Sequence, residues 1–507
     1  MLKLINILIV MASLVACNKT EENNKTDVVF AVEPASLSFS AEGGTQELTV
    51  RCKDNPYVTP WDNWLSCTKG AMADNSIKIS VKAEANNTDS KRKSTISVSH
   101  ADEIIRVEVE QEAGENQGGN GGTSSTEPVR TDNLAWAISD KLGIGWNLGN
   151  HMDAYNNGVS SETAWGNPKA TQATFDGLKK VGFSTVRIPV TWLGHIGEAP
   201  DYKIDEAWLE RVAELVGYAE KAGLNAIVNI HHDGSESKYW LNITQAAINA
   251  ETQKQILAQI TAMWTQIAEK FKDKGDFLIF EAFNEIHDGK WGWGENRKDG
   301  GKQYHCLNEW NAAFVRAVRS TGGKNAERLL GVPAYCTNVD ICIDSFVMPD
   351  DTAKDKLMIS VHCYDPSEYC LTAKYNEWGH TAANNKKVPG DNEEDLKKVF
   401  EKIYTHYISK GIPVYLGEFG CVMRADARSQ SFQQYYLKYY GALARIYGVP
   451  SIIWDNGSKN TGNECHGFIN HGTGAYSNSS AQKAIEALIK GYTDKNLTLK
   501  AIYNQAP

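Results

Sequence analysis

Two glutamates follow apolar segments at positions where an ionisable side chain is out of character. The apolar run 277–283 is followed by Asn284 and Glu285, and the run 412–417 is followed by Glu418. Two carboxyl groups at one rim can hydrolyse a glycosidic bond, because one protonates the leaving oxygen while the other attacks the anomeric carbon. One such glutamate alone would be interpreted as an ion-paired surface residue. Two in equivalent positions favour catalysis.

Other apolar runs also carry or precede side chains that could support such a pair. Arg187 lies within one run, and a guanidinium beside Glu418 would keep that carboxylate ionised. His362 and Tyr364 lie at the end of another run, and a phenol can hydrogen-bond a neighbouring carboxylate and orient it. Trp454 ends the last run, where it would form a floor under a sugar ring. Core packing is the alternative for Trp454, since tryptophan is often buried.

A third group of polar residues is His231, His232 and Asp233. This triplet could suggest a metal site, but no further ligand cluster with metal spacing accompanies it. We therefore interpret the two imidazoles as contacts to sugar hydroxyls, and we predict no metal and no cofactor.

The elements that must position these residues alternate along the second part of the chain. Helical patterns occur between most of the apolar runs, including 204–221, 251–271 and 393–409. This alternation predicts a (β/α)8 barrel, in which functional side chains project from the carboxyl ends of the strands. An open doubly wound sheet is the alternative, but no glycine-rich phosphate loop follows a strand. The predicted strands are 143–149, 184–190, 225–231, 277–283, 328–333, 357–363, 412–417 and 450–454.

A smaller β-rich segment precedes the barrel. Runs of period two, such as 46–50, 77–81 and 105–109, predict a small immunoglobulin-like β-sandwich over 34–113. A Gly/Ser/Asn-rich stretch predicts a flexible linker over 114–130, with the barrel at 131–507. The β-rich segment resembles the BACON domain, which implies either glycan binding or a spacer role, and we favour the spacer. The resemblance rests on Asn63-Trp64-Leu65-Ser66, on 85–88 leading to 94–98, and on 107–111, while Trp61 and Trp64 are the candidate binding platform.

The amino terminus has the pattern of a targeting segment. A lysine is followed by a short apolar run that ends in Leu14-Val15-Ala16-Cys17. This ending resembles a bacterial lipobox, which implies a signal peptide over 1–16, a lipid on Cys17 and a polar tether over 17–33. An ordinary signal peptide with an incidental cysteine is the alternative. The resemblance predicts a lipoprotein anchored in the outer membrane and exposed at the cell surface.

Composition excludes some partners. The net charge of −10 and the pI near 5.7 argue against nucleic acid or an anionic membrane surface as a ligand. The 14 tryptophans and 21 tyrosines suit a protein that stacks aromatic rings on sugars, although aromatic residues are also core material. Cysteine spacing matches neither a zinc site nor a dense disulfide framework, so any disulfide pairing stays open.

Taken together, the barrel region resembles glycoside hydrolase family 5. The resemblance implies that Glu285 is the acid/base and Glu418 the nucleophile of a retaining hydrolase, and that Asn284 contacts the 2-hydroxyl of the reacting sugar. It also implies a supporting set of Arg187, His231, His362, Tyr364 and Trp454, and we predict Asn150 and His232 as further substrate contacts. The matched pieces are 145–150, 187–190, 229–232, 283–285, 362–364, 417–420 and 454–456.

The stretch 162–168 further resembles subfamily 4, whose members act on cellulose, xyloglucan, mixed-linkage glucan or xylan. We expect rim aromatics, among them Trp291, Trp293 and Trp378, to line a cleft. An endo-acting β-1,4-glucanase with xyloglucan as its preferred polymer is the leading hypothesis. The alternatives are a xylanase or mannanase, a non-catalytic glycan-binding lipoprotein, and a metal-dependent hydrolase that uses the His231 to Asp233 triplet.

Overall fold

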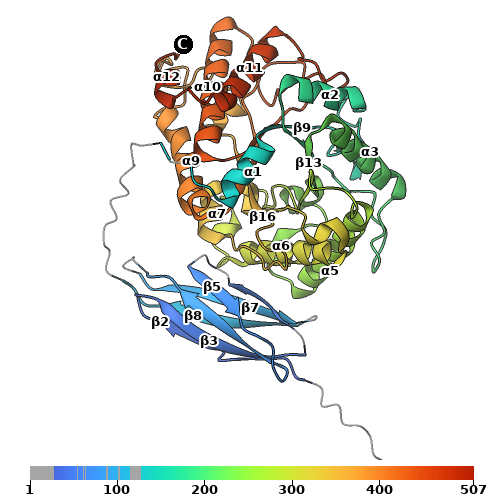
Figure 1. The fold of residues 1–507 in the computed structure, drawn as a ribbon, viewed down its shortest axis with the longest axis vertical. Helices are drawn as coiled ribbons and strands as arrows, with labels where there is room; N and C mark the ends of the chain where they lie inside the picture. Colours follow the sequence, from blue (N-terminus) through green and yellow to red (C-terminus); the bar gives the residue numbers. More distant parts are fainter. Residues whose placement is uncertain are drawn as a thin grey trace, which may run out of the picture.

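The computed structural model describes residues 28–507 except 54, 61, 63, 87–89, 101, 102, 115–126 and 129. Within these residues the chain forms a small β-unit followed by a closed barrel surrounded by helices (Figure 1). The predicted signal segment, the lipidation site Cys17, the candidate platform residue Trp61 and most of the linker lie outside the described residues.

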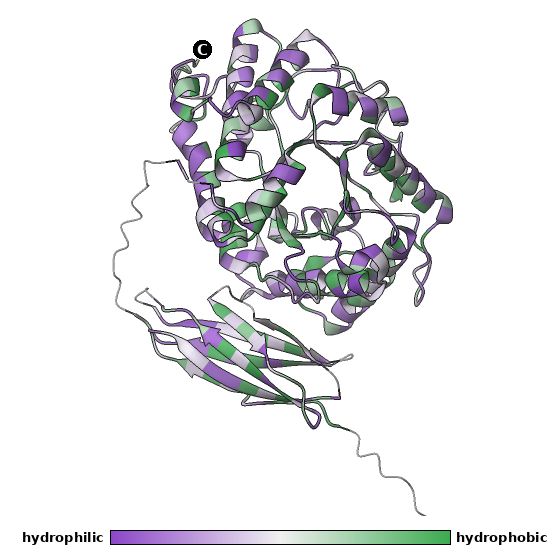
Figure 2. Cartoon of the chain, viewed as in Figure 1, coloured by the Kyte–Doolittle hydropathy of each residue, from purple (hydrophilic) through white to green (hydrophobic). Residues whose placement is uncertain are grey.

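The β-unit is built from two four-stranded sheets, in the orders β1-β3-β6-β5 and β2-β8-β7-β4. Inward and outward residues alternate along β6, where every second side chain is buried. Figure 2 shows hydrophilic and hydrophobic residues interspersed along the strands of this unit. The three predicted runs are parts of β3, β6 and β8, which confirms the β-sandwich. The strands are β1 (Ala31–Glu33), β2 (Ser36–Phe39), β3 (Gly44–Arg51), β4 (Tyr57–Pro60), β5 (Leu65–Lys69), β6 (Ser76–Ala83), β7 (Arg92–His100) and β8 (Glu103–Gln111).

One predicted boundary is wrong. The tether was expected to extend to residue 33, but Ala31–Glu33 forms β1 and pairs antiparallel with β3. Val32 is buried in the sandwich core, and this burial draws the segment into the sheet.

The eight predicted strands of the second unit close into a parallel barrel in the order β9-β12-β13-β14-β15-β16-β17-β18, with β18 pairing back to β9. This closure confirms the (β/α)8 barrel and excludes the open doubly wound sheet. The strands are β9 (Ile144–Asn147), β12 (Thr185–Ile188), β13 (Asn225–Asn229), β14 (Leu278–Glu281), β15 (Leu330–Pro333), β16 (Leu357–Cys363), β17 (Val414–Phe419) and β18 (Ser451–Ile453); a hairpin of β10 (Tyr155–Asn156) and β11 (Val159–Ser160) follows β9.

Helices form the outer layer of the barrel because one face of each is apolar. In α3 the buried residues Trp208, Val212, Leu215, Val216 and Ala219 recur at helical spacing. The helices are α1 (Leu134–Leu142), α2 (Gln172–Val181), α3 (Glu206–Ala222), α4 (Ile243–Ala246), α5 (Ala250–Lys270), α6 (Lys302–Ser320), α7 (Val339–Ser345), α8 (Ser367–Cys370), α9 (Glu393–His406), α10 (Ala427–Tyr447), α11 (Ser479–Thr493) and α12 (Leu499–Tyr503). None of the helices in the described part of the chain is long and apolar enough to cross a bilayer.

Helix α1 closes one end of the barrel. Its residues Ile138 and Leu142 share an apolar cluster with Ile227, Ile279 and Met358, which lie in the first half of β13, β14 and β16. In Figure 1 this helix lies in front of the barrel strands. The functional side chains therefore have to lie at the opposite end, where the strands finish.

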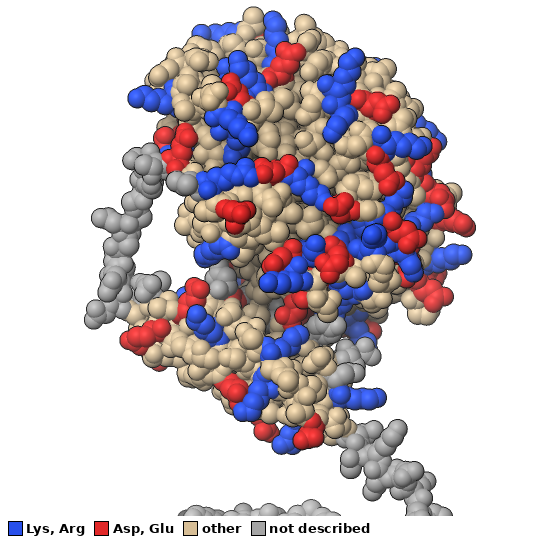
Figure 3. All heavy atoms as spheres, viewed as in Figure 1, with Lys and Arg blue, Asp and Glu red and all other residues tan. Residues whose placement is uncertain are grey.

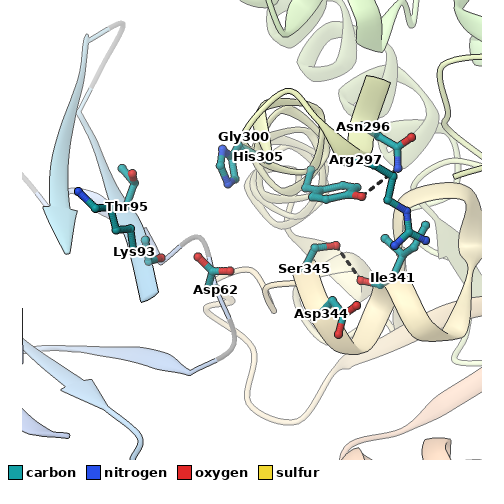
Figure 4. A pocket seen from close by; sticks show the side chains of 13 residues that line it. Asp62, Lys93, Thr95, Asn296, Arg297, Gly300, His305, Ile341, Asp344 and Ser345 are labelled. Carbon is teal, nitrogen blue, oxygen red and sulfur yellow. Dashed lines mark hydrogen bonds between the residues drawn. The ribbon is translucent and has the colours of Figure 1, made fainter. Parts of the chain in front are cut away.

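The sandwich contacts the barrel on the side of α6. Lys69 pairs with Asp350 at 3.0 Å, and Arg106 lies 3.8 Å from Glu309 of α6. A cavity of about 450 Å³ lies between the two units, lined by Asp62, Lys93 and Thr95 on one side and by residues such as Arg297 and His305 on the other (Figure 4). Basic and acidic side chains are interspersed over the face seen in Figure 3, without a large field of one sign.

Candidate active site

The two predicted glutamates meet at the rim where the barrel strands end. Glu418 belongs to β17 and is paired in register with His362 of β16. Glu285 follows β14 by four residues, in a segment held by the hydrogen bond from the Asn284 backbone N–H to the Ile230 carbonyl oxygen. Glu418 is 5% exposed, so the pair sits at the bottom of the rim and not on its outer surface.

His362 lies between the two carboxyl groups. Its Nδ1 is hydrogen-bonded to Glu285 Oε1 at 2.7 Å and lies 3.8 Å from Glu418 Oε2. One oxygen of each carboxyl group lies within 4.8 Å of the other. Retaining glycosidases hold their carboxyl groups about 5–5.5 Å apart, whereas inverting enzymes leave about 6.5–9.5 Å for a water molecule. The separation therefore fits attack by a carboxylate.

Arg187 connects the pair to its surroundings. The side chain is fully buried, and its Nη1 donates to Glu418 Oε1 at 2.9 Å. Its Nη2 donates to Asn284 Oδ1 at 2.8 Å. Because the Asn284 oxygen is thus occupied, the amide N–H₂ is left to donate toward the site. Arg187 therefore orients both the carboxylate and the amide that sequence analysis assigned to substrate.

Glu418 is surrounded by groups that favour its ionised form. Tyr364 donates its hydroxyl to Glu418 Oε2 at 2.9 Å, and His231 Nε2 lies 3.9 Å from Oε1. Burial is the largest influence on Glu418 and raises its pKa, and Arg187 and Tyr364 offset part of that rise. Burial also lowers the pKa of His362 to about 4, so this imidazole is neutral near pH 7.

Glu285 has fewer such partners, because its contacts are with the His362 imidazole and the Thr337 hydroxyl. Burial raises its pKa to about 7, and the opposing effects of His287, Arg187 and Thr337 are weaker. The two carboxyl groups differ in their contacts, since Glu418 accepts from a guanidinium while Glu285 is bonded to an imidazole. Glu285 is therefore suited to carry a proton, and Glu418 is suited to carry a charge. A pair of this kind is what the acid/base and nucleophilic roles require.

Aromatic and imidazole rings form the wall beside Glu418. The rings of His231 and Trp454 are parallel, with centroids 6.1 Å apart, and Trp454 is partly exposed. His232 contacts a group of rings from Tyr155, Trp165 and Tyr239, and Trp165 is 40% exposed. We call Tyr155, Trp165 and Tyr239 the Tyr155 cluster. Sequence analysis did not assign it to the site, although Trp165 stood within the stretch that resembles subfamily 4.

The predicted rim tryptophans are of two kinds, exposed on a loop or buried against a helix. Trp291 is 53% and Trp293 is 80% exposed, both on the loop after β14, with Trp291 stacked on His287 and Arg297 over the Trp293 ring. Asn150 lies just after β9, in the left-handed backbone region at φ 59°. The expectation that Trp378 lines a cleft is wrong, because this residue is 1% exposed and packs against Tyr435, Tyr436 and Tyr439 of α10.

Two polar residues of the site were missed by sequence analysis. Glu281 ends β14 and accepts a hydrogen bond from Arg187 Nε at 2.7 Å. Its signal was available, since a carboxylate inside an apolar strand requires buried partners. Asp153 is fully buried in the loop after β9 and faces His232 at 3.9 Å, and burial raises its pKa to about 7. No pattern in the sequence marked Asp153.

Two groups in the described part of the chain have the geometry to hold a metal ion. One is Asp153 with His231 and His232, which we call the His231 group, and the other is Glu285 with His362 and Glu418. The residue predicted alongside the histidines, Asp233, instead accepts from the Trp192 N–H and the Trp240 indole. Asp153 already accepts the backbone N–H groups of Asn150 and His151, which fixes its carboxylate without a cation.

Comparison with known proteins decides the family. The family model described as cellulase, glycosyl hydrolase family 5, matches residues 152–460, a span that contains both glutamates. The chain belongs to glycosyl hydrolase family 5. It is therefore a glycoside hydrolase of the cellulase family, and the predicted resemblance is confirmed at that level.

Solved structures of this family align closely with the chain. A subfamily GH5-4 broad-specificity endoglucanase from Bacteroides salanitronis is 53% identical, covers 73% of this chain and 98% of its own, and has a TM-score of 0.70. A Bacteroidetes-affiliated GH5 cellulase linked with a polysaccharide utilization locus is 47% identical, with coverages of 74% and 98% and a TM-score of 0.72. A Bacteroides ovatus GH5 xyloglucanase, in complex with a XXXG heptasaccharide, is 27% identical, covers 93% of this chain and 100% of its own, and has a TM-score of 0.64.

Proposed function

We propose that this chain is a retaining, endo-acting β-1,4-glucanase in which Glu418 is the nucleophile and Glu285 the acid/base. The observation that supports these roles best is the pair itself, with carboxyl oxygens within 4.8 Å and different partners, since Glu418 accepts from Arg187 and Tyr364 while Glu285 is bonded to the His362 imidazole. Glu418 attacks the anomeric carbon while Glu285 donates its proton to the leaving oxygen. Glu285 then removes a proton from the water that hydrolyses the glycosyl-enzyme.

The supporting residues have separate roles in this proposal. Arg187 and Tyr364 keep Glu418 ionised and aimed at the anomeric carbon. Asn284 donates to the 2-hydroxyl, and Trp454 forms the floor under the reacting sugar. The exposed rings of Trp291 and Trp293 would stack on sugars further along a polymer, which suits cleavage within a chain.

The substrate we propose is a β-1,4-glucan backbone, with xyloglucan included. The name of the Bacteroides salanitronis structure, broad-specificity endoglucanase, supports action on several glucans. The similarity to the Bacteroides ovatus xyloglucanase extends over 93% of this chain, which supports xyloglucan as one of them. Xyloglucan as the preferred polymer stays a prediction.

A substrate panel tests this proposal. Initial rates and product sizes are measured on xyloglucan, carboxymethyl-cellulose, barley β-glucan, xylan and glucomannan, with Glu418→Gln as the control. We expect oligosaccharides from the glucans and no activity from the variant on any polymer. Faster cleavage of xylan or mannan would contradict the substrate. A variant as active as the wild type would contradict the catalytic role and favour a glycan-binding protein.

The location of the enzyme is a separate proposal. We propose that Cys17 carries a lipid that anchors the enzyme at the cell surface, with the sandwich as a spacer. Cys17→Ser should release the protein from the membrane fraction, and protease added to intact cells should remove the wild-type enzyme. Retention of the variant in the membrane fraction would refute the anchor.

A further inference from the structure

A third carboxylate lies directly beneath the catalytic pair. Glu281 is 0% exposed and has two donors on each oxygen. Oε2 accepts from Arg187 Nε at 2.7 Å and from Asn229 Nδ2 at 2.8 Å. Oε1 accepts from Ser360 Oγ and from Tyr415 OH, both at 2.7 Å. These four donors compensate the burial of the carboxylate, because a buried ionised group without such partners would strongly destabilise the folded protein.

Glu281 and Glu418 share one guanidinium. Arg187 uses Nε for Glu281, Nη1 for Glu418 and Nη2 for Asn284. A guanidinium is planar and rigid, so fixing Nε fixes the direction of both Nη groups. Glu281 therefore determines where Arg187 points, although Glu281 itself is buried below the rim.

Glu281 also sets the charge of the site. Burial by itself would raise its pKa, but Arg187, Tyr415 and Ser360 outweigh burial and lower the pKa, so Glu281 is ionised. One guanidinium thus faces two carboxylates, since burial lowers the pKa of His362 to about 4 and that of His231 well below its ordinary value. The negative charge of Glu281 raises the pKa of Glu285. It also offsets the positive charge that stabilises ionised Glu418.

We propose that Glu281 is a positioning residue that acts through Arg187, aiming it at Glu418 and Asn284 and offsetting its charge. This inference rests on the catalytic roles proposed above and adds a residue to them. Other charged or titratable groups also face the pair and remain unchanged when Glu281 is varied. They are Asp153 after β9, His231 after β13, His287 after β14, His362 and Tyr364 of the β16 end, and Glu464 after β18.

Two substitutions of Glu281 separate its effect on the position of Arg187 from the effect of its negative charge. Glu281→Gln keeps the size of the side chain and removes the charge. Glu281→Asp keeps the charge and withdraws the carboxylate from Arg187 by about 1.5 Å, one carbon–carbon bond. Tyr415→Phe is the matched control, because it removes one donor to Glu281 and leaves the charge in place.

The experiment measures kcat and KM from pH 4 to 9 on the best glucan of the panel, with thermal melts of each variant. For Glu281→Gln we expect both limbs of the pH profile to move to lower pH, because Glu418 and Glu285 both lose a negative neighbour. For Glu281→Asp we expect kcat to fall about 100-fold, with KM nearly constant and both limbs in place. For Tyr415→Phe we expect unshifted limbs.

If Glu281→Gln folds and both limbs of its pH profile stay at the wild-type pH, the proposed effect of the Glu281 charge is overturned. A Glu281→Asp enzyme with wild-type kcat would overturn the positioning part, and this test holds even if Glu281→Gln does not fold. The catalytic roles fail separately, since an active Glu418→Gln variant contradicts them whatever the Glu281 variants do.

Discussion

Replacing Glu285 by glutamine should strongly reduce activity on polysaccharide and stabilise the protein at alkaline pH. Glutamine has nearly the size of the glutamate and can keep the contact to His362 Nδ1, which is 2.7 Å long in the wild type. The substitution therefore removes the proton and the charge with little change in packing.

The loss of activity follows from the pKa of Glu285. With a pKa raised to about 7 by burial, about nine-tenths of the molecules carry the proton at pH 6 and about one-tenth at pH 8. The wild-type kcat/KM should therefore fall tenfold for each pH unit above about 7. In Glu285→Gln the rate on polysaccharide should drop by about 10²–10⁴, and that alkaline limb should disappear.

The gain in stability follows from the same raised pKa. Because the folded pKa of about 7 is above the ordinary value of 4.5, the folded protein binds the proton more tightly than the unfolded chain does. The wild type therefore loses stability as the pH rises from 4.5 through 7, by at most about 3 kcal/mol. The variant has no such loss, so its advantage should be absent near pH 4 and largest above pH 7.

The assay combines reducing-sugar rates from pH 4 to 9 with thermal melts of wild type and variant at pH 4.5 and 8. A cellobioside with a dinitrophenol leaving group is the control, because its departure needs no proton and the glycosylation step should survive. A variant that retains the alkaline limb would show that another group is the acid. Equal melting temperatures of wild type and variant at pH 8 would show that Glu285 is not held in its neutral form.

Three further predictions concern the walls of the site and its chemistry. Trp454→Ala should lower kcat/KM on glucans by about 10–100-fold through lost stacking, with an unchanged pH profile; unchanged kinetics would mean that the ring touches no sugar. Trp293→Ala should change the free energy of unfolding by less than about 0.5 kcal/mol and weaken action on long polymers. Trp378→Ala should lower that free energy by about 3–5 kcal/mol without altering the product pattern. Thermal melts in which Trp293→Ala is the less stable variant would contradict the burial of Trp378. Excess EDTA should leave activity intact, and a loss restored by a divalent cation would implicate the His231 group.

The barrel could be predicted from sequence because its signals are local. Each strand of a parallel barrel is buried on both faces, so it appears as a short apolar run, here with strands of three to seven residues. At the ends of these apolar runs, polar residues occur only where the site requires them. Their positions identified Glu285, Glu418 and His362 as candidates. The family match then fixed the same region independently.

The errors concern properties that depend on which elements pack together. Trp378 belongs to a loop that folds back onto α10, and nothing in its neighbours distinguishes that position from a cleft wall. Glu281 was overlooked because a single carboxylate in an apolar run identifies no partner until β12, β16 and β17 are brought beside it. The boundary at residue 33 failed because pairing of β1 with β3 is a long-range contact.

The most direct test of the proposed mechanism is to trap the glycosyl-enzyme. The protein is incubated with 2-deoxy-2-fluoro-β-cellobiosyl fluoride, digested, and its peptides are measured by mass spectrometry. We expect one added fluorocellobiosyl group, on the peptide containing Glu418 and at that residue, with the label lost in Glu418→Gln. A label on another residue would contradict this mechanism, as would an initial product of inverted anomeric configuration.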